Sequence, residues 1–195
     1  MNASLHPRPW SECDVVVLGG GPAGAAAAIT LAREGRAVVV LEKSQYEQAH
    51  IGETLPPTAR LPLAGLAVWE PFLAAEHLPS PGVLSAWGEE ELYEQHFIFN
   101  PYGSGWHLDR QRFDMMLAHA ARQAGTQVCC GAQIRACLPL AAAGWQVAFT
   151  SGGLCHQLRA TFVIDATGRP AVWARRQGAK RLNSDRLVGL AGVLA

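Results

Sequence analysis

The sequence predicts an α/β fold built around a parallel sheet, and three consecutive segments near the N-terminus carry that prediction. Asp14–Leu18 continues as an apolar, β-branched run, which is typical of a strand buried on both faces. Ala23–Glu34 is rich in alanine and is followed by Gly35, as expected of a helix and its stop. Ala37–Leu41 is a second buried strand. Strand, helix and strand within about thirty residues form a βαβ unit, whose strands are parallel.

The composition is that of a globular chain with a sizeable core. Of the 195 residues, 49% are hydrophobic and 16% are charged, which excludes a disordered chain. Sixteen basic residues balance sixteen acidic ones and no basic tract stands out, which argues against nucleic acid as a main partner.

The uncharged stretch Val15–Ala32 is nearly long enough to cross a bilayer. Glycine and proline break it into two short elements, so we expect no membrane span. The N-terminus, MNASLHPRPW, is too polar for a secretory signal, and the five cysteines form no C-x-x-C pair. We therefore expect a reduced, cytoplasmic setting. The seven histidines show no metal-ligand spacing, so we expect no metal site.

The turn between the first strand and the helix reads Gly19-x-Gly21-x-x-Gly24. Gly19 permits the tight turn, Gly21 lets a pyrophosphate approach the backbone, and Gly24 lets the helix pack closely on the strand. The helix N-terminus, at Pro22 and Ala23, offers N–H groups and a partial positive charge to phosphates.

An acidic residue follows the second strand at the position that a dinucleotide site requires. Glu42, eighteen residues beyond Gly24, can accept hydrogen bonds from a ribose diol, and Lys43 is its neighbour. The glycines thus follow a strand, open a helix and have their acid in place, which predicts dinucleotide binding. The alternative is a glycine turn that serves only packing.

Three groups of segments resemble one family, the flavin-dependent monooxygenases and halogenases with the aromatic-hydroxylase type of FAD fold. The first is GGGPAG, Gly19–Gly24, with Glu42. The second is Gly52–Pro57, which is similar to the G-E-x-x-x-P loop of flavin halogenases. The third is the pair WHLDRQRFDMML and FVIDATGRP. The resemblance covers residues 14 to 170 and implies FAD as the cofactor.

The resemblance also implies the domain organisation. We expect a single Rossmann-like FAD-binding domain over residues 10–195, with three-layer ββα architecture. An incomplete substrate region would include segments at about 75–105 and 185–195. The chain ends in the apolar run RLVGLAGVLA and holds no Gly-Asp dipeptide, which the family places beneath the pyrophosphate. We therefore expect a chain truncated at its C-terminus.

The later elements follow from periodicity and turn residues. His107–Gly125 begins with polar residues and continues as an amphipathic helix. Its apolar face is expected at Phe113, Met116, Leu117 and Ala120. Thr126–Leu138 is expected to form a strand with a polar turn. Two further strands, Trp145–Thr150 and Leu154–Ala160, flank Ser151-Gly152-Gly153 as a hairpin. Phe162–Ile164 is expected to be another short buried strand.

Several site residues are implied by the resemblance. An arginine at the head of the amphipathic helix reaches the phosphate side of the flavin in that family, and Arg110 occupies this place; the alternative is a solvated arginine. The strand and D-x-x-G turn are similar to the family's second flavin contact, which assigns Asp165 and Gly168 to the cofactor. The alternative is a plain strand-ending turn. Glu53 is the polar candidate near the flavin ring, or it starts a short helix.

Aromatic side chains gather between the Gly52–Pro57 loop and Arg110. We expect them to form core more often than to stack on a substrate, within strands and loops that begin a substrate region. They are Trp87, Phe97, Phe99, Tyr102 and Trp106.

The reaction is also inferred from the resemblance. Halogenases that resemble this chain use a lysine past the G-E-x-x-x-P loop, but Lys43 and Lys180 lie elsewhere. The chain looks closer to flavoproteins that oxidise a tryptophan in a partner protein. This implies a monooxygenase that hydroxylates an aromatic, tryptophan-like substrate through a flavin C4a-hydroperoxide. A flavin reductase or reduced nicotinamide would supply electrons. The alternatives are a flavin-dependent halogenase, a non-catalytic flavin-binding remnant and a nicotinamide-dependent dehydrogenase.

Overall fold

The computed structural model describes residues 11–47, 54–86, 88 and 91–182. The helices and strands are β1 (Glu12–Leu18), α1 (Pro22–Arg33), β2 (Val38–Leu41), β3 (Thr54–Leu55), the 3-10 turn η1 (Pro57–Ala59), α2 (Arg60–Gly65), α3 (Trp69–Ala74), β4 (Leu78–Ser80), β5 (Gly82–Ser85), β6 (Tyr93–His96), β7 (Gly105–His107), α4 (Arg110–Gln123), β8 (Gln127–Cys129), β9 (Gln133–Pro139), β10 (Trp145–Ser151), β11 (Leu154–Asp165) and α5 (Val172–Arg176).

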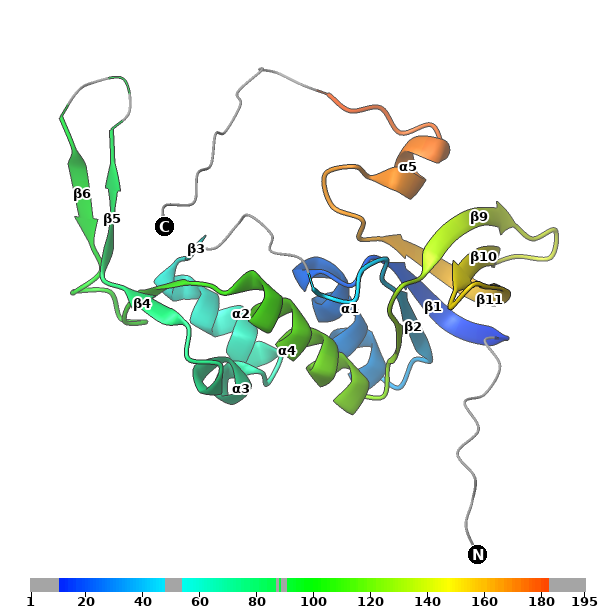
Figure 1. Cartoon of the computed structure of the whole chain (residues 1–195), viewed down its shortest axis with the longest axis horizontal. Coiled ribbons are helices and arrows are strands. Elements are labelled where there is room, and N and C mark those ends of the chain that lie inside the picture. The colour runs from blue at the N-terminus through cyan, green and yellow to red at the C-terminus, as the bar shows by residue number, and fades with distance from the viewer. Residues whose placement is uncertain (1–10, 48–53, 87, 89–90, 183–195) are drawn as a thin grey trace, which may run out of the picture.

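A six-stranded sheet with the order β8-β2-β1-β11-β10-β9 forms the centre of the fold (Figure 1). The pairs β2–β8, β1–β2 and β1–β11 are parallel, and the pairs β10–β11 and β9–β10 are antiparallel. The predicted βαβ unit is confirmed as β1, α1 and β2. The predicted α/β fold with a parallel sheet is confirmed as well.

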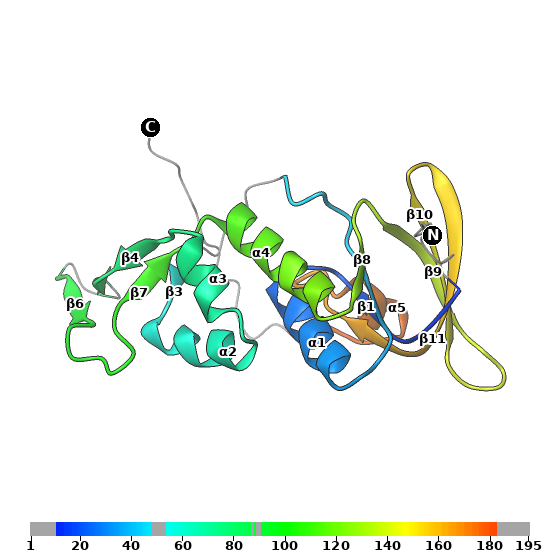
Figure 2. The same ribbon diagram turned by 90° about the horizontal axis from the view of Figure 1, so that it is seen from below.

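The sheet is covered on both faces, and the alternation of side chains along β1 explains how. Val15 and Val17 pack with α1 and α4, whereas Val16 and Leu18 pack in a second core with β9, β10, β11 and α5. Figure 2 shows α1 and α4 side by side against the parallel strands. Helices, parallel strands and the antiparallel strands with α5 thus form three layers.

Two sequence-based expectations about strands were wrong. Thr126–Leu138 is not one strand with a turn, because β8 and β9 lie at opposite edges of the sheet. Phe162–Ile164 is not a separate buried strand either. It belongs to β11, a twelve-residue strand that pairs with β10 in its first half and with β1 in its second. Phe162 is 64% exposed, because the second half of β11 is covered only in part.

A second region, which the sequence analysis did not resolve into elements, holds α2, α3 and two small sheets. The strands β3, β7 and β4 form one sheet, and the hairpin β5–β6 projects from the body of the molecule (Figure 1). Trp106 packs against Phe72 with ring centroids 5.3 Å apart, which confirms a core role for this aromatic residue. Phe99 is instead 95% exposed. Trp87 lies outside the described residues.

The predicted helix 107–125 is observed as α4. Asp109 caps its N-terminus by accepting a hydrogen bond from the Arg112 backbone N–H at 3.1 Å. Of the predicted apolar face, Phe113 and Leu117 are buried, whereas Met116 and Ala120 are partly buried.

Among the described residues, no helix has both the length and the apolar character that crossing a bilayer requires. The five cysteines are all free thiols. The described part of the chain holds no group of three or more histidine, cysteine or acidic side chains arranged to bind a metal ion.

Candidate functional site

A cleft of about 740 Å³ opens at the carboxyl ends of β1, β2 and β11. Ligands of open α/β sheets bind at this edge, and the volume lies within the range of about 300–1,000 Å³ typical of ligand pockets. The residues that line the cleft are Gly19, Gly21, Pro22, Ala23, Leu41, Glu42, Lys43, Arg110, Asp114, Ala132, Gln133, Ile134, Ala166, Thr167, Gly168, Arg169, Pro170 and Val172.

The glycine loop between β1 and α1 is shaped by three different constraints. Gly19 has a φ of +104°, which favours glycine, and a Cβ there would lie 2.5 Å from the Ala166 carbonyl oxygen. A Cβ on Gly24 would lie 2.0 Å from the Gly19 oxygen, so this glycine permits close packing. A Cβ on Gly21 would meet nothing within 4 Å and would extend into open space beside the cleft.

The N-terminus of α1 faces the same cleft through Pro22 and Ala23. Gly21 is the N-cap residue, and no side chain caps the helix by a hydrogen bond. The first turn holds no acidic residue that would compete with an anion. A phosphate could therefore approach the first N–H groups of this twelve-residue helix.

Glu42 stands between the loop and the end of β2. One carboxylate oxygen accepts a hydrogen bond from the Gly20 backbone N–H at 2.6 Å. The other accepts hydrogen bonds from the Ser44 N–H at 2.8 Å and the Ser44 hydroxyl at 2.7 Å. These bonds fix the carboxylate at the cleft wall, and its remaining lone pairs suit the ribose role predicted for it.

Arg110 and Asp114, near the start of α4, form an ion pair that lines the cleft. The Arg110 Nη2 atom lies 3.1 Å from Asp114 Oδ2, and the two side chains are 15% and 5% exposed. Arg110 Nε and Nη2 also donate to Asp114 Oδ1, at 3.4 and 3.3 Å. The predicted arginine is thus held at the cleft by a carboxylate one helical turn away, and its role toward the flavin phosphates stays a prediction.

The D-x-x-G turn contributes to the cleft through its backbone end. Gly168, with a φ of +74°, lines the cleft, but Asp165 does not. The Asp165 carboxylate accepts hydrogen bonds from the Thr167 N–H and hydroxyl and from the N–H groups of Trp173 and Ala174. Burial acts to raise the pKa of this carboxyl, but the hydrogen bonds from Thr167 and α5 outweigh it, so the pKa lies below its usual range.

Most of the predicted cofactor residues come together in this cleft: Gly19, Gly21, Pro22, Ala23, Glu42, Lys43, Arg110 and Gly168. Gly24 and Asp165 do not line the cleft. Gly24 lets α1 pack closely on the glycine loop, and Asp165 accepts a hydrogen bond from the start of α5. Glu53, the predicted polar residue near the flavin ring, lies outside the described residues. The roles of all these residues toward a bound cofactor stay predictions.

The open space at Gly21, the uncapped helix end, the acceptor Glu42 and the cation Arg110 together fit an adenine dinucleotide. The sequence analysis did not assign Asp114, Gln133, Ile134 and Arg169 to the cleft, although all four line it. For Asp114 a signal existed, because Arg110 and Asp114 are four residues apart on one helix. For Gln133 and Ile134 no such signal existed in the sequence, because only the sheet topology brings the start of β9 to the cleft.

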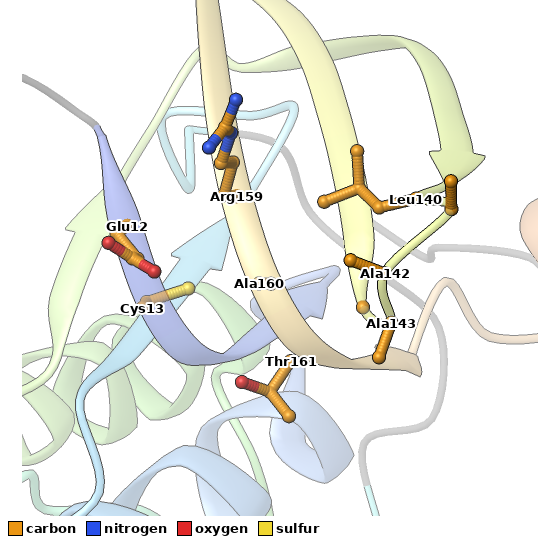
Figure 3. A pocket seen from close by; sticks show the side chains of 10 residues that line it. Glu12, Cys13, Leu140, Ala142, Ala143, Arg159, Ala160 and Thr161 are labelled. Carbon is orange, nitrogen blue, oxygen red and sulfur yellow. The ribbon is translucent and has the colours of Figure 1, made fainter.

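A second cavity, of about 490 Å³, lies at the opposite end of β1 (Figure 3). Glu12 on β1 and Arg159 on β11 are register partners, and Ala142 and Ala143 belong to the turn between β9 and β10. The side chains of Glu12 and Arg159 are both exposed. The charged residues of this lining are exposed, and its buried residues, Cys13 and Ala160, carry no charge, so the cleft at the glycine loop is the stronger candidate.

Known proteins resemble this chain in sequence and in fold. A family model described as FAD dependent oxidoreductase matches residues 14–182. A tryptophan 2-halogenase of Chondromyces crocatus is 33% identical over 170 residues, which cover 84% of this chain and 32% of the relative. A putative FAD-dependent oxidoreductase, LodB, of Marinomonas mediterranea is 30% identical over 186 residues, or 93% of this chain and 50% of the relative.

Among solved structures, the myxobacterial chondrochloren halogenase CndH, a variant of the FAD-dependent halogenases, superposes with a TM-score of 0.75. It is 28% identical, and the match covers 82% of this chain and 38% of that one. The chain therefore spans 32% to 50% of the length of these proteins.

Proposed function

The chain belongs to the FAD dependent oxidoreductase family, and we propose that it forms the FAD-binding part of an enzyme that halogenates an electron-rich aromatic ring. The observation that carries the FAD site is the convergence of the glycine loop with Glu42, the start of α4 at Arg110 and the D-x-x-G turn on one cleft at the carboxyl edge of the parallel strands. The similarity to the tryptophan 2-halogenase and to CndH supports halogenation, and the similarity to the tryptophan 2-halogenase supports an indole ring as the substrate class.

Each part of the cleft has a task in holding FAD. The Gly21 backbone and the N-terminus of α1 would bind the pyrophosphate, and Glu42 would accept hydrogen bonds from the adenosine ribose. Arg110, held in place by Asp114, would add a positive charge on the phosphate side. Gly168 would let the backbone of the D-x-x-G turn approach the cofactor closely.

When bound and reduced, FAD supplies two electrons and two protons, so that dioxygen, one further proton, a halide ion and an aromatic C–H yield a carbon–halogen bond and two waters. The residues of this chain would bind and orient the cofactor. The electrons would come from a flavin reductase or a reduced nicotinamide.

Hydroxylation of the aromatic ring is the second candidate function, and the lysine pattern favours it. In the resembled halogenases a lysine past the G-E-x-x-x-P loop takes part in halogenation, but Lys43 lines the cofactor cleft and Lys180 follows α5. The substrate would then gain an oxygen atom, and a tryptophan side chain in a partner protein would be a suitable target.

Two measurements test these proposals. The chain is incubated with FAD and desalted, and the desalted protein is expected to retain absorption bands at about 375 and 450 nm. It is then supplied with a flavin reductase, NADH, bromide or chloride, and tryptophan or indole. A substrate gain of about 34 Da with chloride supports halogenation, and a gain of about 16 Da in halide-free buffer supports hydroxylation. Retained FAD without either product contradicts both reactions for this chain.

A further inference from the structure

Gly20, the loop residue between the motif glycines, is held by two side chains that follow β2. Its N–H donates to Glu42 at 2.6 Å, and its carbonyl accepts a hydrogen bond from the Tyr46 hydroxyl at 3.0 Å. A Cβ on Gly20 would lie 2.2 Å from Tyr46 Oη and 2.9 Å from Glu42 Cβ. Both side chains therefore pack directly on the loop, and both backbone polar groups of Gly20 are engaged.

Tyr46 is itself held in an uncommon conformation. Its φ of +62° lies in the left-handed region, which bulky side chains rarely adopt, and its side chain is buried. Such strain persists only where the surroundings over-determine the backbone, and it concentrates at functional sites. The Tyr46 N–H donates to the Ser44 hydroxyl, which donates to Glu42. Glu42, Ser44 and Tyr46 thus form one network behind the loop.

We propose that Tyr46 is a positioning residue for the FAD cleft, which fixes the glycine loop in its binding conformation by holding the Gly20 carbonyl. This inference rests on the proposed FAD site. Tyr46 does not line the cleft, so it acts through Gly20 rather than by contact with the ligand. With Gly20 fixed, the neighbouring Gly21 and the α1 N-terminus are already placed for a pyrophosphate. The loop is then already ordered in the folded chain, so binding does not lose conformational entropy in ordering it.

The chemistry of the phenol suits a permanent donor. Burial, and next the nearby Glu42 carboxylate, raises the pKa of Tyr46 well above its usual range. The hydroxyl therefore remains protonated and keeps its hydrogen bond to Gly20 at neutral pH.

The test uses Tyr46→Phe, which removes only the hydroxyl, with Tyr93→Phe as a matched control because Tyr93 is 70% exposed on β6. The affinity of each chain for FAD and for ADP is measured by titration. We expect Tyr46→Phe to weaken both ligands about 5- to 12-fold, the equivalent of one neutral hydrogen bond, and Tyr93→Phe to leave both unchanged. ADP is included because it retains the pyrophosphate but lacks the flavin.

Hydrogen–deuterium exchange separates positioning from a general loss of stability. Exchange in Tyr46→Phe should rise in peptides covering residues 18–25 and stay unchanged in β9 and β10, whereas a global effect would raise both. Affinities for FAD and ADP within twofold of the unsubstituted chain overturn the positioning role and leave the FAD site intact. A loss for FAD without one for ADP also overturns it. An unsubstituted chain that binds neither ligand overturns both the FAD site and this inference.

Discussion

Arg110 and Asp114 lie one turn apart on α4 and form a nearly buried ion pair at the wall of the cleft, with 3.1 Å between Nη2 and Oδ2. Removing one partner of such a pair leaves the other charge buried, which costs more than replacing both together. The pair therefore links the electrostatics of the site to the stability of the fold.

Arg110→Met should lower the free energy of unfolding by about 3 kcal/mol, because Asp114 keeps its burial and loses this cation. The double variant Arg110→Met/Asp114→Leu should lose less than the sum of the two single variants. Urea unfolding of the unsubstituted chain and the three variants measures the coupling. Additive effects would show that the pair is not energetically coupled.

Gly21→Ala should fold normally and bind FAD poorly. The added Cβ meets no protein atom within 4 Å, but it would occupy the space in which we place the pyrophosphate. We expect a change in melting temperature of at most about 2 °C and a loss of FAD affinity of about tenfold or more. Gly65→Ala is the matched control, since a Cβ there also meets open space, on α2. Equal FAD affinity in both variants would contradict the placement of the pyrophosphate.

Asp165→Asn should destabilise the chain by about 1–3 kcal/mol at pH 7, because the amide replaces an acceptor of four hydrogen bonds. The pKa of Asp165 is lowered in the folded state. The stabilisation is therefore fully present above the ordinary carboxyl value of about 3.9 and is lost as the pH falls through the folded value.

The difference in unfolding free energy between the unsubstituted chain and Asp165→Asn should accordingly be constant from about pH 7 to pH 5 and narrow below about pH 3.9. Glu12→Gln, at an exposed position on β1, serves as the control. A difference that widens on acidification would contradict the direction of the Asp165 shift.

His77 should make the fold sensitive to mild acid. Its ring is buried against Phe72 and Phe113, and its Nδ1 accepts a hydrogen bond from the Asp109 N–H at 3.3 Å. Its Nε2 finds no hydrogen-bond partner within the part of the chain that the structure describes. Burial lowers its pKa, and this outweighs the opposing effect of the Asp109 carboxylate, while Arg112 adds to the lowering. The folded state therefore resists protonation, and stability should fall as the pH drops below the ordinary value of about 6.5.

Melting temperatures between pH 8 and pH 5 would measure this loss. His77→Gln should be less stable at pH 8, because the packing on Phe72 is lost, but should show a shallower fall below about pH 6.5. His96→Gln, with its ring exposed on β6, should retain the full dependence on pH. An unchanged slope in His77→Gln would assign the acid sensitivity to other groups.

The parts of the fold that the sequence predicted are those in which local patterns and tertiary packing agree. The βαβ unit was predicted because Val15–Leu18 is apolar throughout and the glycines mark the turn. Helices α2 and α3 were not predicted, because each has only six residues, contains a proline and is stabilised by packing of Leu63 and Phe72 in the core. The path of β11 could not be predicted, since one strand with two different partners shows no break in the sequence.

The same division applies to the site. The glycine loop and Glu42 were predicted because each task there depends on residue type at fixed spacing. Asp165 was assigned from its motif, but its side chain accepts a hydrogen bond from the Trp173 N–H in the first turn of α5, eight residues further along. The hydrogen bond from the Tyr46 hydroxyl to the Gly20 carbonyl joins residues 26 positions apart. It depends on a left-handed backbone conformation at Tyr46 that no local sequence pattern predicts.

The path of β11 has a consequence for synthesis on the ribosome. The strands β1 and β2 and the glycine loop emerge before β11, so β1 lacks its second neighbour until β11 has been made. Until then the open edge of β1 is an apolar template for pairing with other chains. The glycine-loop side of the nucleotide cleft is thus synthesised before the side formed by the D-x-x-G turn. The nascent chain should therefore depend on chaperones until Gly168 has left the ribosome.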